Sequence, residues 1–325
     1  MRVVLTVAAA VVVAVFLYRQ RDLAAGFRSA AAEAKWYWLG VAFVAEMASM
    51  VPLAQAERIV LRIAAVDAPL AEMTAVTFAS NAIASSVPGG AAVAQGYAFK
   101  RYKHFGAGDG EAAWAELSSG AIAFSALAAI ALAGSIIGVG HAAPVVIPIL
   151  SVVLAGSLGA VALFRRPQLL CEVVDGIERR LPKRAGTDAA ERLRAIADEL
   201  GDIHPPLSTW AGAYVLSVLN WLLDVVCLAF TFIALGAPIP WGAIFLAFAG
   251  TKVVSNIGIT PGGLGLVEGG MVATFVALGV ESGTAAAAVV MYRGLTIVGL
   301  VGFGWLMVAY LSAHGRHPHE RLTTR

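Results

Sequence analysis

The feature that most constrains this chain is a series of eight apolar runs, most of them near or above the roughly 20 residues with which a helix crosses a bilayer. The runs occupy residues 3–18, 36–54, 71–99, 112–138, 142–164, 207–235, 241–278 and 284–311. None alternates apolar and polar residues as a half-buried strand would. Charged residues make up only 14% of the chain, against about 25% in an ordinary soluble domain. The sequence therefore predicts an all-α, polytopic helix bundle in a membrane.

Charge and cysteine content exclude several classes of partner. The net charge is only +2, and no stretch interleaves basic and aromatic residues as nucleic-acid binders do, so no nucleic-acid partner is expected. Cys171 and Cys227 are the two cysteines, and their spacing matches no metal-ligand pattern. We expect no disulfide, no metal site and no cofactor.

A nine-residue signature occurs twice inside the apolar runs, as PGGAAVAQG at residues 88–96 and as PGGLGLVEG at residues 261–269. Gly106 and Gly279 keep the same offset of 173 residues, and a Ser-Asn pair precedes each copy. Proline and glycine cut these runs into pieces of about 9 to 17 residues. A 16-residue helix rises about 24 Å, which is less than the roughly 30 Å of hydrocarbon. We expect two re-entrant hairpins, with tilted full crossings as the alternative.

The runs and signatures together divide the chain into five parts and predict about six full spans plus two broken segments. The parts are an N-terminal anchor helix with an amphipathic connection (1–35), a first membrane half (36–164), an amphipathic connection (165–206), a second membrane half (207–313) and a polar tail (314–325). The first run also resembles a signal peptide. Arg19 and Arg21 follow it where a cleaved signal would have small residues, which favours a retained anchor.

Basic residues are distributed unevenly among the connections. Lys100, Arg101 and Lys103 cluster in one connection and many arginines in the connection 165–206, whereas residues 139–143 and 236–240 carry no Lys or Arg. By the positive-inside rule the basic connections face the cytoplasm. We therefore expect a multi-pass protein of the inner (plasma) membrane with residues 165–206 in the cytoplasm.

The number of crossings links the signatures to the symmetry of the fold. If both signature segments re-enter, the spans that begin at Trp36 and Leu207 run in opposite directions and the halves form an inverted repeat, as in many transporters. The first hairpin would then enter from the basic side and the second from the opposite side. Full crossings by both segments would give a parallel repeat instead.

Six ionisable residues lie inside the apolar runs, where each costs roughly 2.5 to 3.5 kcal/mol on insertion scales. They are Glu46, Glu116, Asp224, Lys252, Glu268 and Arg293. One interpretation is that buried ion pairs fix the helix register, for example Arg293 with Glu268 or Asp224. The other is that the charges line a binding site. Glu116 lies about one turn from its expected helix start, which would place it at the interface.

The binding interpretation places a lipid phosphate at the helix starts after each signature, where free backbone N–H groups and the helix dipole favour an anion. Lys252 and Arg293 would add positive charge, while Glu46, Asp224 and Glu268 would take an amine or a proton. The second signature is the better candidate because it has more charges around it. The candidate residues are Pro261, Gly262, Gly263, Glu268, Lys252, Asn256, Arg293, Asp224, Glu46, Pro88, Gly89, Gly90, Gln95 and Asn81.

From about residue 36 to 311 the chain resembles the flippase-like membrane proteins related to the lysylphosphatidylglycerol synthase transmembrane region. The resemblance is carried by Ser80-Asn81 with PGGAAVAQG, Ser255-Asn256 with ITPGGLGLVEGG, and Tyr292-Arg293. In the multiple peptide resistance factor, such a domain is fused to a soluble aminoacyl-transferase domain and is associated with moving aminoacylated phosphatidylglycerol between leaflets. Little chain follows the last apolar run here, so the resemblance implies lipid translocation without lysyl transfer.

Three functions follow as hypotheses. The first is a translocator of a phospholipid or a polyprenyl-phosphate-linked lipid, driven by a proton or lipid gradient, because no Walker-type loop is present. The second is a membrane-embedded enzyme acting on lipid head groups, which lacks a recognisable nucleophile constellation. The third is an accessory subunit of cell-envelope lipid synthesis. Besides a lipid with a phosphate head group, the partner would be a second copy of the chain or a cell-envelope enzyme.

Overall fold

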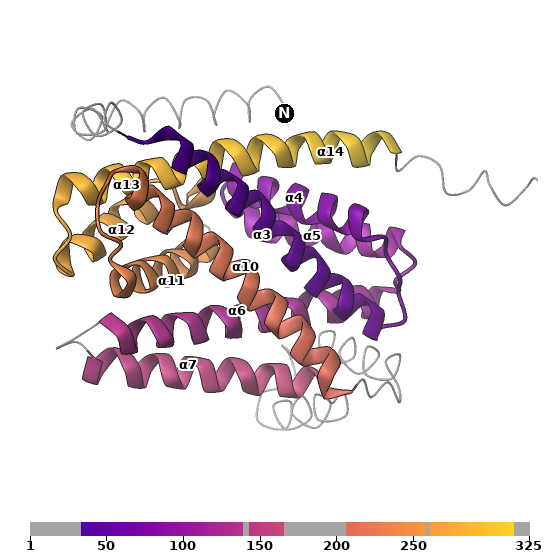
Figure 1. The fold of residues 1–325 in the computed structure, drawn as a ribbon. Helices are drawn as coiled ribbons and strands as arrows, with labels where there is room; N and C mark the ends of the chain where they lie inside the picture. Colours follow the sequence, from indigo (N-terminus) through magenta and orange to yellow (C-terminus); the bar gives the residue numbers. More distant parts are fainter. Residues whose placement is uncertain (1–33, 139–142, 166–205, 258–259, 315–325) are drawn as a thin grey trace, which may run out of the picture.

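The computed structural model describes residues 34–138, 143–165, 206–257 and 260–314, and within these ranges the chain forms helices and turns without a strand. Figure 1 shows the arrangement. The elements are α3 (Trp36–Ile63), α4 (Leu70–Ser86), α5 (Gly90–His104), α6 (Asp109–Gly138), α7 (Ala143–Phe164), α10 (Leu207–Ala234), α11 (Trp241–Ile257), η2 (Pro261–Gly263), α12 (Leu266–Ala277), α13 (Ser282–Gly294), the π-helical η3 (Leu295–Val301) and α14 (Gly302–His314). The expected anchor helix, the connection 166–205 and the tail from 315 lie outside the described residues.

Five of the described helical segments are long and apolar enough to cross a membrane. They are Trp36–Ile63, Asp109–Ile137, Ile147–Phe164, Leu207–Ala234 and Ser282–His314. An apolar run of this length must satisfy its backbone hydrogen bonds internally in lipid, which makes it a helix. These segments match five of the six expected full spans, and the sixth, at residues 3–18, is outside the described part of the chain. The predicted all-α membrane bundle is confirmed.

The outer surface of the bundle is apolar. α7 lies at the lower edge of the bundle in Figure 1, and only 6% of its segment Ile147–Phe164 is buried. Its Val152 is 72% exposed, Val298 of η3 is 75% exposed and Ile136 of α6 is 68% exposed. Contiguous apolar surface of this kind belongs against lipid tails rather than water. The chain is a multi-pass membrane protein.

Both signature segments form hairpins of short helices. The first hairpin consists of α4, with 17 residues, and α5, with 15 residues. The second consists of α11, with 17 residues, then η2 and α12, with 12 residues. At 1.5 Å per residue the longest of these helices rises about 26 Å, which falls short of the roughly 30 Å hydrocarbon core.

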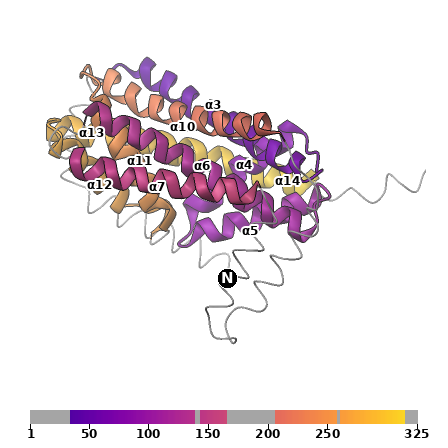
Figure 2. The same ribbon diagram turned by 90° about the horizontal axis from the view of Figure 1, so that it is seen from below.

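α3 and α10 form an antiparallel pair that links the two halves. The amide of Lys35, just before α3, donates to the carbonyl of Ala234 at the end of α10 (2.8 Å), and Asn220 of α10 donates to the carbonyl of Ser49 in α3 (2.9 Å). The two helices lie side by side in both views (Figures 1 and 2). Their opposite direction is the relation that an inverted repeat requires.

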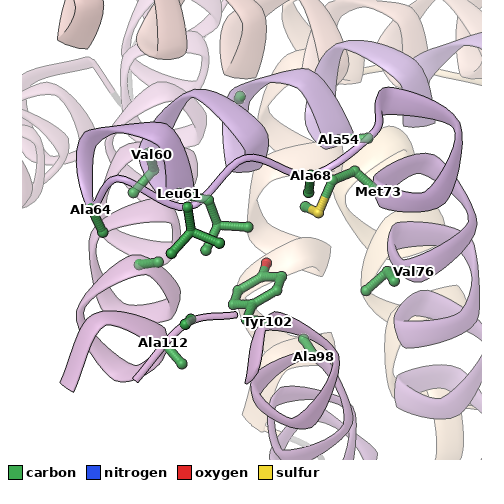
Figure 3. Packing of buried hydrophobic residues seen from close by; sticks show 14 of the residues in the cluster. Ala54, Val60, Leu61, Ala64, Ala68, Met73, Val76, Ala98, Tyr102 and Ala112 are labelled. Carbon is green, nitrogen blue, oxygen red and sulfur yellow. The ribbon is translucent and has the colours of Figure 1, made fainter. Parts of the chain in front are cut away.

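Two buried clusters occupy opposite ends of the bundle. The first joins the connections after α3 and α5 to the start of α10 and the end of α14, through Val66, Ala107, Trp210 and Leu311. Figure 3 shows its centre, where Tyr102 of α5 lies among Val60 and Leu61 of α3, Met73 of α4 and Ala112 of α6. The second cluster joins the connections after α10 and α12, through Leu235, Ala237, Leu278 and Val280. The open ends of the two hairpins therefore lie at opposite ends of the bundle.

The sequence repeat is also a repeat of backbone conformation. Gly89 has φ 65° and ψ 16°, and Gly262, its counterpart in the second copy, has φ 56° and ψ 17°. Gly106 and Gly279 have φ values of 101° and 90°. Left-handed backbone of this kind strains any residue with a Cβ, so glycine is needed where each hairpin turns.

Candidate functional site

The breaks of the two hairpins touch each other in the middle of the bundle. A Cβ on Gly262 would lie 3.0 Å from the carbonyl oxygen of Ser85, one residue before the end of α4. On the other side of the same turn, Trp305 of α14 donates its indole N–H to the hydroxyl of Ser86 (3.0 Å). Because Gly262 has no side chain, the backbone of the second break can approach the first this closely.

An ion pair holds the second signature in place. Nε of Arg293, on α13, donates to Oε1 of Glu268 at 2.6 Å, and a second guanidinium nitrogen donates to the carbonyl of Gly262 at 2.6 Å. The side chains of Arg293 and Glu268 are 14% and 8% exposed. Of the two pairings that the sequence left open for Arg293, the structure has the one with Glu268.

The carboxylate of Glu268 also caps α12. Its Oε2 accepts the amide of Gly265 at 2.6 Å, directly before the helix begins. The sequence predicts a lipid phosphate at the helix start that follows residues 261–263. In the structure the chain's own carboxylate binds that amide, so the second signature is held by internal contacts of its own.

Gly265 explains why the two copies differ in structure. It has φ 86° and ψ −47° and delays the start of α12 to Leu266. The residue at the corresponding place in the first copy is Ala92, which lies inside α5, and α5 starts at Gly90. The first copy therefore passes straight from its glycine turn into a helix, and no side chain caps that helix.

A second charged group, the Glu46–Asp224–Lys252 cluster, lies between the two halves. Asp224 of α10 accepts a hydrogen bond from the hydroxyl of Tyr292 (2.6 Å) and forms an ion pair with Lys252 of α11 (2.5 Å). Glu46 of α3 is 3% exposed, as is Asp224. The cluster thus joins residues from both sides of the repeat.

A cavity of about 580 Å³ lies beside the first signature. Helices α3, α4, α5, α6 and α10 form its walls, and its polar lining includes Glu57, Asn81, Gln95, Glu116 and Ser119. The size lies within the range of roughly 300 to 1,000 Å³ that is usual for small-molecule sites. A cavity of this size with several polar side chains in its wall can hold a hydrated or charged group away from lipid tails.

The polar groups of the cavity are only partly satisfied by the protein. Glu57 accepts a hydrogen bond from Thr77 (2.8 Å), and Asn81 donates to the carbonyl of Thr77 (3.0 Å). The buried hydroxyls of Ser80 and Ser119 have no hydrogen-bond partner among the described residues. Buried polar atoms without partners are rare in folded proteins and point to water or a ligand.

Trp221 connects the cavity to the central charges. It lines the cavity, and its indole N–H donates to the carbonyl of Ala123 (2.8 Å). The ammonium of Lys252 lies 5.5 Å from the centre of its ring and 5.0 Å from that of Phe248. A cation over an aromatic face is stabilised by the ring quadrupole. Trp221 therefore contacts both the cavity and the ammonium of Lys252.

The predicted site residues fall into three groups. Glu46, Asp224 and Lys252 form the central cluster, Glu268 and Arg293 hold the turn of residues 261–263, and Asn81 and Gln95 line the cavity. At the first turn Pro88 and Gly89 are exposed, whereas Gly90 is buried. Asn256 lies in α11, and its side chain is outside what the structure describes.

Two carboxylates of the cavity were not recognised as site residues from the sequence. Glu57 lies just beyond the apolar run 36–54, which made it look like part of a connection, yet α3 continues to Ile63. Glu116 was expected near the interface because the run was taken to begin at 112. α6 begins at Asp109, and Glu116 lies about two turns inside it on the cavity wall.

Residues 3–304 match the family described as "Lysylphosphatidylglycerol synthase TM region". The match includes both signatures, all the cavity residues and the central charges. No curated protein matches the chain.

Proposed function

Because the chain belongs to the lysylphosphatidylglycerol synthase TM region family, whose members are membrane proteins related to lipid metabolism, we propose that it moves a phospholipid between the leaflets of its membrane. The head group would pass through the cavity beside the first signature, while the acyl chains stay in the surrounding lipid. The observation that carries this proposal is the cavity itself, a space of about 580 Å³ inside a membrane bundle whose mostly apolar wall carries several polar side chains.

The physical barrier to lipid exchange is the head group. A phosphate or amine in hydrocarbon loses its hydrogen bonds to water, which costs several kcal/mol or more for a charged group. Side chains such as Asn81, Gln95 and Ser119 can replace part of that hydration. The apolar outer surface, including Val152 and Ile136, lets the tails remain in lipid.

The lining favours a head group that carries both a phosphate and an amine. Glu57 and Glu116 place two carboxyl groups in the cavity, which suits an ammonium group. The first turn of α5 contributes Ala91 to the same cavity, and no side chain caps this helix. The amides of Gly90 and Ala92 already donate to the carbonyls of Val87 and Gly89, so this helix start offers a phosphate the N–H of Ala91 and the positive end of the helix dipole. The proposed binding site is thus at the first signature, with the second as the element that supports it.

The test is leaflet exchange in liposomes that contain the purified chain. The probe is a fluorescent phosphatidylethanolamine, with phosphatidylglycerol labelled in the same way for comparison, and exchange is followed by bleaching of the outer leaflet. Ala123→Trp fills the cavity and should slow exchange at least about tenfold, which corresponds to about 1.4 kcal/mol in the barrier. Val152→Trp places the same ring on the exposed face of α7 and serves as the matched control.

Absence of exchange with the wild-type chain would overturn the proposal, and so would equal rates for Ala123→Trp and the control. The proposal includes no chemical step, and mass spectrometry of the lipids recovered from the same liposomes checks this. Unchanged lipid masses are expected, whereas a new lipid species would favour an enzyme acting on head groups.

A further inference from the structure

The register of the α3–α10 pair places two carboxyl groups against each other. Asn220 of α10 binds the carbonyl of Ser49 in α3. One turn further along each antiparallel helix from this contact lie Asp224 and Glu46, since residues three or four apart share a helix face. Their carboxyl groups are close enough to interact directly, and both residues are 3% exposed.

The described residues around Glu46 and Asp224 supply fewer hydrogen-bond donors than two ionised carboxylates require. Asp224 takes the ammonium of Lys252 and the hydroxyl of Tyr292. Oε2 of Glu46 is buried and has no hydrogen-bond partner in the part of the chain that the structure describes. A buried acceptor without a donor costs free energy, and so do two like charges brought close together away from water.

Among the described residues, the charges around the pair leave one negative charge without a counterpart. Besides the two carboxyl groups, the titratable and charged groups that act here are Lys252 from α11, Tyr292 and Arg293 from α13, and Cys227 on α10 itself. Arg293 is paired with Glu268. Lys252 therefore balances one of the two carboxylates.

We propose that the chain binds one proton between Glu46 and Asp224, so that the two residues form a shared carboxylic acid–carboxylate pair. The proton satisfies Oε2 of Glu46, removes the repulsion and leaves a single carboxylate opposite Lys252. Glu46 belongs to the first half and Asp224 to the second, so the proton links the two halves at their contact. This inference is independent of whether the chain moves lipids.

Infrared spectroscopy of the purified chain in lipid nanodiscs at neutral pH tests the proposal. A protonated buried carboxyl gives a C=O stretching band, separate from carboxylate bands, that shifts in heavy water. Because the proton is shared, Glu46→Gln and Asp224→Asn should each remove the same component of that band. Glu57→Gln and Glu116→Gln, in the cavity, should leave this component in place, and so should Glu281→Gln at the exposed start of α13.

Each outcome decides the proposal. Absence of the component from the wild-type chain, or its presence in both Glu46→Gln and Asp224→Asn, would overturn the shared proton. Loss of the component in only one of the two variants would place the proton on that residue alone and would contradict the sharing. Lys252→Met provides a second measurement that keeps both carboxyl groups. Without the ammonium both groups should be protonated, so the component should roughly double, and an unchanged intensity would contradict the proposal.

Discussion

At the scale of single residues, Arg293 is the side chain on which the second signature most depends. It binds the carboxylate of Glu268 and the carbonyl of Gly262, both at 2.6 Å. Removing one partner of a buried pair leaves an uncompensated charge, so Arg293→Gln should lower the free energy of unfolding by about 3 to 5 kcal/mol. Thermal unfolding in detergent measures this. The double variant that also carries Glu268→Gln should lose less free energy of unfolding than the two single variants lose together.

The control for this prediction is an ion pair of the same type on the surface. Arg62 pairs with Asp67 at 2.8 Å, but their side chains are 47% and 71% exposed. The hydrogen bond from Arg62 lowers the pKa of Asp67, yet water screens the pair, so Arg62→Gln should leave the melting temperature nearly unchanged. If Arg293→Gln and Arg62→Gln lowered the melting temperature equally, burial would not be what sets the strength of the Arg293 pair.

Residue-scale pairing was only partly predictable. The sequence identified five of the charges in the two clusters because each interrupts an apolar run, and it proposed Arg293 with Glu268 as one pairing. It gave no reason to pair Asp224 with Lys252 or Tyr292. Those contacts depend on how α11 and α13 pack against α10, which is a matter of side-chain volumes across distant segments rather than of any local pattern.

At the scale of elements, Gly265 sets where α12 begins. Its φ of 86° is unfavourable for any residue with a Cβ, although no atom lies within 4 Å of the position that a Cβ would take. Gly265→Ala should therefore destabilise the chain through backbone strain alone, by about 1 to 3 kcal/mol. The reverse change at the corresponding position, Ala92→Gly in α5, should cost no more than about 1 kcal/mol. Thermal unfolding of the two variants provides the comparison. An unchanged melting temperature for Gly265→Ala would show that the left-handed turn is not required.

The elements themselves followed closely from the sequence. Helix breaks at the two Pro-Gly-Gly tripeptides were predicted because proline and glycine end helices whatever surrounds them. The different starts of α5 and α12 were not predicted, because they depend on Glu268 capping Gly265 and on Arg293 from another helix. The apolar runs also ended too early for α3 and began too late for α6, because the last turns of α3 and the first turn of α6 are rich in polar residues. That misplacement hid the two cavity carboxylates.

At the scale of the whole molecule, antiparallel α3 and α10 and the opposed hairpins make the second half an inverted counterpart of the first. Counting crossings from the sequence predicted this relation, because the direction of each span is fixed once the hairpins re-enter. The cavity was not predicted, since it lies where five helices fail to fill the space between them. The ion pair at the second signature follows from charges that the first copy lacks, whereas the cavity at the first signature depends on how the helices pack.

This arrangement predicts which connections share a face of the membrane. In a background without Cys171 and Cys227, single cysteines are introduced at exposed Asp67, His104 and Ser282, and sealed vesicles are treated with a membrane-impermeant maleimide. Asp67→Cys and His104→Cys flank the first hairpin and should react from the same side, which the positive-inside rule predicts to be the cytoplasmic one. Ser282→Cys, after the second hairpin, should react only from the other side. If the first signature segment crossed the membrane completely, positions 67 and 104 would react from opposite sides, and the inverted repeat would be wrong.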